Sequence, residues 1–134
     1  MITYQTENNL RSDEFRKVLI SSKLGERRPI DNNIRLEKML RGANLIITAR
    51  SNNEIIGVAR SLSDFTYCTY LSDLAVDEKY QKQGIGKELI RRTKIESGDA
   101  KLILLSAPSA IDYYPKIGMK KHPYCYYIDS ISEI

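Results

Sequence analysis

Two glycines separated by one residue, Gly84 and Gly86, follow a predicted strand that ends in Leu74-Ala75-Val76 and open a predicted helix. Helix N-termini expose backbone N–H groups without intrahelical partners and carry partial positive charge, so they bind phosphate oxygens. Glycine lets a bulky phosphate approach the backbone closely. The segment therefore predicts a phosphate-binding loop, to which Lys82 and Lys87 would add positive charge.

Two better-known phosphate-binding motifs do not fit this loop. The dinucleotide fingerprint needs a third glycine where the chain has Leu89. The P-loop needs glycine where the chain has Gln81, and serine or threonine where it has Glu88. A Gly-x-Gly pair by itself is typical of an ordinary turn, so the assignment depends on the residues around it.

Those residues resemble the acyl-CoA loop of the GNAT superfamily of N-acetyltransferases. Gln81-x-x-Gly84-x-Gly86 is preceded by Leu74-Ala75-Val76-Asp77-x-x-Tyr80 and followed by Lys87-x-Leu89-Ile90. Further along, in the family's usual order, residues 110–119 resemble its Ala-x-x-x-Tyr-x-x-x-Gly-Phe segment. The resemblance covers about residues 71–119. Within it, Met119 replaces the usual phenylalanine, and Pro115 is expected to disturb a short helix.

The resemblance implies an α/β fold with a mixed, mostly antiparallel central sheet that is splayed between two parallel strands and flanked by helices. The pantetheine arm of acetyl-CoA, the implied cosubstrate, would lie where the strands predicted at 66–76 and 101–106 part. No metal is implied. The implied acetyl-CoA-binding residues are Leu74, Ala75, Val76, Gln81, Lys82, Gln83, Gly84, Ile85, Gly86, Lys87 and Tyr114.

Acetyl transfer to an amine needs a neutral amine, a stabilised oxyanion and a proton for the leaving thiolate. A lysine-like amine has a pKa of about 10.4, so a base is expected to act on it directly or through water. Tyr114 matches the family tyrosine near the coenzyme sulfur and is the candidate acid, although it could also only pack against the coenzyme. Asp73 is the candidate base, or else a group that attracts a cationic amine or a structural hydrogen-bond acceptor. A backbone N–H of the same strand could hold the oxyanion.

Apolar spacing and turn residues predict the elements that would position these groups. Strands are expected at 2–5, 44–50, 54–62, 66–76 and 101–106, and helices at 12–21, 31–40, 85–97 and 109–116. Ser12 and Asp31 are the expected N-caps of the first two helices, and Ile34, Met39 and Leu40 are expected to face the core. The near-continuous apolar run 101–106 predicts a strand covered on both faces, and the tyrosine-rich tail 119–128 predicts a further strand.

Composition narrows the class of protein. The chain has 134 residues, which fits one domain spanning 1–134, and a net charge of +4 from 21 basic and 17 acidic residues. The basic pairs are scattered, and Arg27-Arg28 reads as part of a solvated turn, so nucleic-acid binding is not expected. Residues 61–78 hold four acids and no base, which could favour a cationic substrate. Cys68 and Cys125 read as reduced, partly buried thiols. The chain shows no transmembrane run or signal peptide, so no membrane partner and a cytoplasmic location are expected.

The sequence thus favours an acetyl-CoA-dependent N-acetyltransferase whose partner is an amine-bearing small molecule or peptide. The alternative is a non-catalytic acyl-CoA-binding sensor or scaffold, which would keep the glycine loop but could dispense with Tyr114 and Asp73. The presence of both residues favours the enzyme. The terminal tyrosines could line an acceptor pocket or support a homodimer, although packing in a last strand is the simpler expectation.

Overall fold

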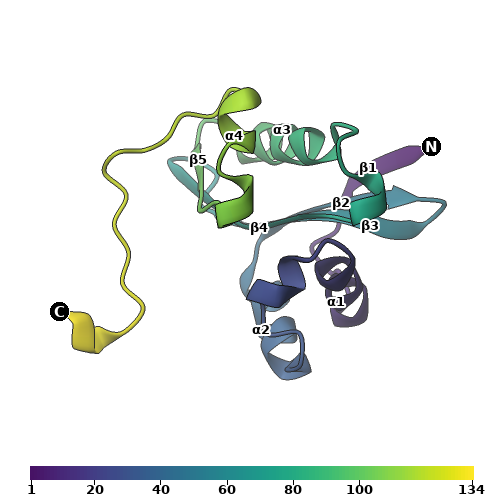
Figure 1. Cartoon of the computed structure of the whole chain (residues 1–134), viewed down its shortest axis with the longest axis horizontal. Helices are drawn as coiled ribbons and strands as arrows, with labels where there is room; N and C mark the ends of the chain where they lie inside the picture. The colour runs from purple at the N-terminus through teal and green to yellow at the C-terminus, as the bar shows by residue number, and fades with distance from the viewer.

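The computed structural model describes residues 1–134, and its centre is one five-stranded sheet (Figure 1). Neighbouring strands follow one another in chain order from β1 to β5. The first four are antiparallel, whereas β4 and β5 are parallel. This is the mixed, mostly antiparallel sheet that was expected. The strands are β1 (Ile2–Thr6), β2 (Leu45–Ser51), β3 (Glu54–Ser63), β4 (Cys68–Val76) and β5 (Lys101–Leu104).

Helices cover both faces of the sheet. Figure 1 shows α1 (Ser12–Ser21) and α2 (Asn33–Gly42) on one face, and α3 (Ile85–Ser97) and α4 (Tyr113–Lys116) on the other. Each face has its own buried apolar cluster, one around Phe15 and Val58 and the other around Leu71 and Leu89. Short 3-10 turns complete the chain at η1 (Leu24–Arg27), η2 (Glu78–Tyr80), η3 (Pro108–Ala110) and η4 (Ile131–Glu133).

The helix ends differ in detail from the sequence expectation. Ser12 is the first helical residue rather than the N-cap of α1, and its hydroxyl reaches Glu37 instead. The second helix is capped by Asn32, not by Asp31, because the Asn32 side chain accepts a 3.1 Å hydrogen bond from the Arg35 amide. That start turns Ile34 to solvent.

The C-terminal third departs most from expectation. Strand β5 ends at Leu104 and forms the edge of the sheet, so its side chains alternate between half-buried and exposed instead of being covered on both faces. The tail predicted as a strand at 119–128 has no regular structure. The helix expected at 109–116 is reduced to the four-residue α4, which ends one residue after Pro115, and the 3-10 turn η3 precedes it. Within α4, Pro115 lies in the first turn, where its missing N–H is tolerated.

A buried arginine joins the N-terminal elements to the sheet. Arg50, on β2, forms two hydrogen bonds of 2.8 and 2.9 Å with the Glu7 carboxylate and two of 2.7 and 3.0 Å with Glu14 of α1. Hydrogen bonding by Arg50 lowers the pKa of Glu7 to about 2. The charge is therefore fully paired where it is buried, as a buried ion requires.

Several other features bear on the expected class. None of the helices is long and apolar enough to cross a membrane. No three His, Cys, Asp or Glu side chains come together in a way that could hold a metal ion. Cys68 and Cys125 are free and exposed, not partly buried.

Candidate functional site

The site begins where β4 parts from β5. The two strands pair only from Cys68 to Leu71 of β4, and the rest of β4 pairs with β3 alone. Arg60 of β3 lies opposite Asp73 and the next residue lies opposite Leu71, so Ser72 is the extra residue of a β-bulge. The bulge therefore coincides with the point at which β4 loses its second neighbour.

Beyond the bulge, β4 presents a free backbone edge. The Asp77 amide donates to Ile56 of β3 at 2.8 Å, and backbone groups alternate sides along a strand. The N–H and C=O groups of Leu74 and Val76 consequently point away from β3, toward the gap left by β5. The Gln81 side chain reaches back and donates to the Val76 carbonyl at 3.0 Å. Gln81 thus fixes the following loop against the end of this edge.

The loop after β4 exposes a row of unpaired amides. The backbone N–H groups of residues 82–86 donate to no protein acceptor. The first hydrogen bond of α3 runs from the Glu88 amide to the Gly84 carbonyl, at 3.0 Å. Left-handed backbone at Lys82 (φ 64°) and Gly84 (φ 83°) turns the chain into the helix. Successive amides at a left-handed turn and a helix N-terminus form an anion-binding concavity. The turn and the helix start are as the sequence indicated, and phosphate binding by them stays a prediction.

Tyr113 lies at the same helix end. A Cβ built on Gly86 would lie 3.0 Å from the Tyr113 hydroxyl and 3.9 Å from Val76. Burial raises the pKa of the Tyr113 hydroxyl, and a backbone hydrogen bond with Lys87 acts in the opposite direction. Gly86 is therefore a contact point between α3 and α4 as well as part of the loop, a role the sequence did not reveal.

Tyr114 belongs to α4, on the face of the sheet that α3 also covers. Its side chain is half-buried against the apolar cluster that contains Leu71, and its ring meets that of Tyr113 edge-on at 5.2 Å between centroids. Burial raises the pKa of Tyr114, with a smaller contribution from Tyr113 in the same direction. The phenol is consequently protonated at neutral pH, as a proton donor must be.

Asp73 does not have the surroundings of a general base. Its side chain is 0% exposed, and its two oxygens bind two guanidinium groups, Arg28 on one oxygen and Arg60 on the other. Arg28 also donates to the Ser72 carbonyl at 2.9 Å, and Arg60 donates to the Ser72 hydroxyl at 3.1 Å. A carboxylate held in this way cannot reach a substrate amine. Of the roles considered for Asp73, the geometry fits the structural hydrogen-bond acceptor, and the base role is corrected.

The sequence did not predict that Arg28, Asp73 and Arg60 form a buried charged cluster. Arg28 was assigned to a solvated turn with Arg27, yet its side chain is only 23% exposed and bridges the η1 region to the bulge. Arg60 had no assigned role. Its place inside the apolar run of β3 could have indicated a buried ion pair, because a charge at a core position needs a partner.

The acidic stretch 61–78 is not a single acidic surface. Asp64 accepts hydrogen bonds from the amides of its own turn, and these bonds lower its pKa to about 2. Asp77 accepts from the Lys79 amide at 2.9 Å, and Glu78 lies 4.0 Å from Lys23. Of the four acids only Asp73 is neutralised by buried arginines, and the others stay anionic at the surface, so attraction of a cationic substrate by this stretch stays a prediction.

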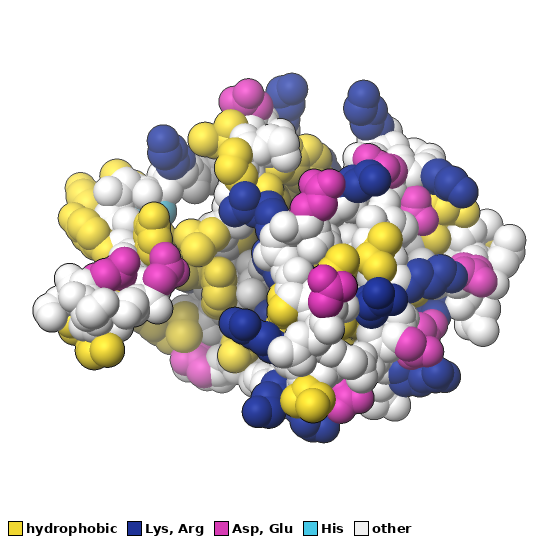
Figure 2. All heavy atoms as spheres, turned by 60° about the horizontal axis from the view of Figure 1, so that its bottom comes forward, with side chains coloured by type: hydrophobic (Ala, Val, Ile, Leu, Met, Phe, Trp, Pro, Cys, Tyr) yellow, Lys and Arg dark blue, Asp and Glu magenta, His cyan; other side chains and the backbone are white.

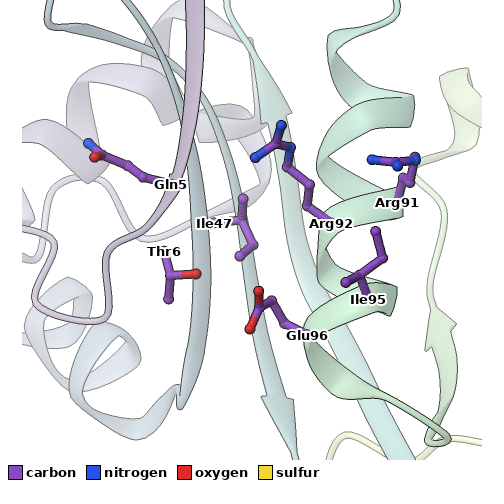
Figure 3. A pocket seen from close by; sticks show the side chains of 7 residues that line it. All are labelled: Gln5, Thr6, Ile47, Arg91, Arg92, Ile95 and Glu96. Atoms are coloured by element: carbon purple, nitrogen blue, oxygen red, sulfur yellow. The ribbon is translucent and has the colours of Figure 1, made fainter.

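Two hollows of the surface lie away from these residues. Figure 3 shows a pocket of about 150 Å³ between α3 and the β1–β2 edge, lined by Gln5, Thr6, Ile47, Arg91, Arg92, Ile95 and Glu96. There Arg92 lies 4.7 Å from the centre of the Tyr4 ring and donates to Glu88 at 2.7 Å, so its charge is already engaged. A second hollow of about 420 Å³ lies between α1 and α2. The candidate site is instead an open sheet edge, which suits an extended ligand better than a compact one.

Comparison with protein families matches residues 27–127 to the model described as an acetyltransferase (GNAT) domain. The GCN5-related N-acetyltransferase 2, chloroplastic, of Arabidopsis thaliana is 29% identical over 77 residues, which are 55% of this chain and 30% of that protein. The chain spans about 30% of the length of the curated relatives it matches. The family match at residues 27–127 includes the loop and α4.

Solved structures share the whole arrangement of the fold. An aminoglycoside N-acetyltransferase in complex with CoA superposes with a TM-score of 0.74 at 14% identity, covering 98% of this chain and 95% of that one. A GNAT-family acetyltransferase protein from Streptococcus pneumoniae TIGR4 gives a TM-score of 0.70 at 19% identity, covering 96% of this chain and 98% of that one. At these identities the likeness is one of fold.

Proposed function

The chain belongs to the GNAT acetyltransferase family, and from that premise we propose that it transfers the acetyl group of acetyl-CoA to a primary amine. The observation that carries the proposal is the pairing of two backbone features. The free amides of residues 82–86 suit a pyrophosphate, and the free edge of β4 suits the amide groups of a pantetheine arm. Both features lie on consecutive segments of one strand–loop–helix unit, so one extended ligand can use them together.

Residues 82–86 would hold the pyrophosphate through their amides, as helix N-termini hold anions. Lys82 and Lys87, both exposed, would add charge attraction. The Leu74 and Val76 backbone would pair with the pantetheine amides in the way an added strand pairs with a sheet edge. With the pyrophosphate at the loop and the pantetheine along β4, the reacting thioester would lie near Leu74 and the bulge at Ser72.

The chemistry is a direct attack in a ternary complex. The neutral amine attacks the thioester carbonyl, the C–N bond forms, and the C–S bond breaks to release the coenzyme thiolate. Tyr114 gives its phenolic proton to that thiolate, because burial keeps the phenol protonated. The Leu74 amide, which points to the gap, is the proposed donor to the oxyanion. Water takes the proton from the amine, since Asp73 is engaged elsewhere.

The arginine cluster at Asp73 supports this site indirectly. It fixes the bulge from the face opposite α3, through contacts to both the carbonyl and the hydroxyl of Ser72. The direction of the Leu74 amide depends on that bulge. Asp73 is therefore proposed as a positioning residue rather than a catalytic one.

The acceptor is proposed to be an amine-bearing small molecule or peptide, and the cytoplasmic location stays a prediction. The test is the release of free thiol from acetyl-CoA in the presence of a panel of polyamines, aminoglycosides and peptides. Thiol release that requires both an amine and Tyr114 supports the enzyme. Tight acetyl-CoA binding without amine-dependent release across the panel would favour the non-catalytic sensor instead.

A further inference from the structure

Three apolar side chains lie side by side on a part of the sheet that the helices leave exposed. Leu62 of β3 is the register partner of Tyr70 of β4, and Tyr70 is the register partner of Ile103 of β5. Their exposed fractions are 43%, 36% and 45%. Cross-strand neighbours hold their Cβ atoms about 5 Å apart, so the three residues form one continuous apolar row. Contiguous exposed apolar surface of this kind marks a binding site.

The apolar row lies on the α1–α2 side of the sheet, next to the proposed reacting centre. Leu71 packs in the cluster beneath α3, so its neighbour Tyr70 points to the opposite face. Asp73 lies on that opposite face too, because the bulge shifts the alternation at Ser72. Tyr70 is two residues from Ser72, which is about 7 Å along a strand. Figure 2 brings this side of the molecule forward and shows hydrophobic side chains gathered on the part of the body beside the C-terminal tail.

Polar residues bound the apolar row and limit the size of a ligand that could lie on it. On the side away from the bulge, Cys68 is the register partner of Lys101, and the Cys68 sulfur lies 3.8 Å from the Asp64 carboxylate. Three strands spaced about 4.8 Å apart make the row roughly 10 Å wide. The row therefore has room for one small apolar or aromatic group lying flat.

The charges at the bulge are unfavourable for a polycation. Arg28 and Arg60 share the single carboxylate of Asp73, so this cluster has one positive charge in excess. A nearby positive charge disfavours the ammonium form of an amine. An amine held beside Ser72 would consequently lose its proton more readily, whereas further ammonium groups on the same molecule would be repelled.

We propose that the apolar row binds the body of the acceptor, and that the acceptor is a monoamine in which a short alkyl spacer joins the primary amine to one aromatic or apolar group. This inference rests on the proposed acetyl transfer and names its substrate class. The coenzyme site proposed above uses the gap between β4 and β5 and the side of the sheet that α3 and α4 cover, so the α1–α2 side is left for the acceptor. With its body on Tyr70, such an acceptor directs its amine along β4 toward Ser72 and Leu74. Tyr70 is the specificity-determining residue at the centre of the row.

The rate of thiol release from acetyl-CoA with three amines tests the substrate class. We expect kcat/KM for 2-phenylethylamine to exceed that for ethanolamine by roughly tenfold to a hundredfold, the range for an apolar group that gains a complementary surface, with spermidine no better than ethanolamine. Tyr70→Thr removes the ring but keeps a strand-forming residue, so it should abolish the preference and leave the KM for acetyl-CoA unchanged. Ile95→Thr, at an exposed isoleucine of α3, is the matched control. Equal use of the three amines by the natural protein, or a preference that survives Tyr70→Thr, would overturn the proposal.

A binding measurement distinguishes failure of this inference from failure of acetyl transfer. The chain has no tryptophan, so Tyr70→Trp places a single indole in the apolar row. Its fluorescence should change when 2-phenylethylamine is added and not when ethanolamine is added, and Ile95→Trp should respond to neither. A response without thiol release would support the row as a binding site and refute the acetyl transfer. Thiol release without a response in Tyr70→Trp would refute the row and leave the acetyl transfer standing.

Discussion

The hydroxyl of Tyr113 lies against the α-carbon of Gly86, so that a methyl group on that glycine would approach the hydroxyl to 3.0 Å. The contact joins α4 to the first turn of α3, at the end where the amides are free. Gly86 consequently serves helix packing as well as the approach of a phosphate. A substitution of Gly86 therefore affects both helix packing and phosphate approach. Combining it with a substitution of Tyr113 separates the two effects.

Gly86→Ala is expected to destabilise the protein by about 1–3 kcal/mol, the usual cost of adding a methyl to a tight contact. Tyr113→Phe removes the clashing oxygen and leaves the ring carbon beneath it at an ordinary 3.7 Å. The double variant should therefore recover most of the lost free energy of unfolding, as a double-mutant cycle measured in urea would show. Additive losses would mean that the two residues do not contact each other as described.

Tyr114→Phe is expected to lower kcat by about 10² or more, the range of general acid catalysis, and to leave acetyl-CoA affinity unchanged. Because burial raises the pKa of Tyr114 above its ordinary 10.0, the phenol stays protonated below that pH. The rate of the natural enzyme should rise with pH as the amine loses its proton, with no decline from Tyr114 before pH 10. A decline at lower pH that disappears in Tyr114→Phe would contradict this.

Asp73→Asn is expected to act mainly on stability. It leaves Arg28 and Arg60 without their anionic partner, and breaking a buried ion pair costs about 3–5 kcal/mol. Thermal and urea unfolding would measure the loss. If Asp73 were a base, the same variant would instead keep its stability, and kcat would fall by about 10² or more.

Glu7→Gln tests the other buried arginine. The pKa of Glu7 falls from 4.5 to about 2, chiefly through its hydrogen bonds with Arg50, so the folded state binds fewer protons than the unfolded state. This contribution to stability is present above pH 4.5 and is lost as the pH falls toward 2. Glu7→Gln should remove about 1–3 kcal/mol at neutral pH and flatten the acid dependence. Glu54→Gln, in an exposed pair with Lys17, is the control and should change little.

The conformation of the loop before α3 could be predicted because it depends on neighbouring residues. Gly84 sits in the left-handed region, and α3 begins at the next residue, as the glycine spacing indicated. The strand–loop–helix order of β4 and α3 follows from the same short stretch of sequence. The groups proposed to bind the phosphates are backbone amides, so few side chains had to be identified.

The charges around the bulge could not be predicted from the sequence. Arg28 and Asp73 are far apart along the chain, and only the packing of η1 against β4 brings them together. Alternation along β4 also fails at Ser72, where one extra residue sends Leu71 and Asp73 to opposite faces of the sheet. A bulge leaves no reliable mark in a single sequence, so the role of Asp73 stayed open.

The tail shows a different limit. Residues 124–128 have the composition of a strand, yet a strand needs a neighbour with which to pair. These residues pair with no strand, and the segment has no regular structure. The strand predicted for the tail was wrong, because pairing and not composition decides whether a strand forms.

The central claim is that the amides before α3 bind acetyl-CoA, and calorimetric titration of the full chain with acetyl-CoA tests it most directly. Gly84→Trp should weaken binding by at least about tenfold, because its side chain would cover those amides. Gly98→Trp is the matched control, since Gly98 also has a positive φ and open space but lies at the far end of α3. We expect binding to the natural protein and to Gly98→Trp, and its loss in a folded Gly84→Trp. No binding by the natural protein, or equal binding by both variants, would contradict the account.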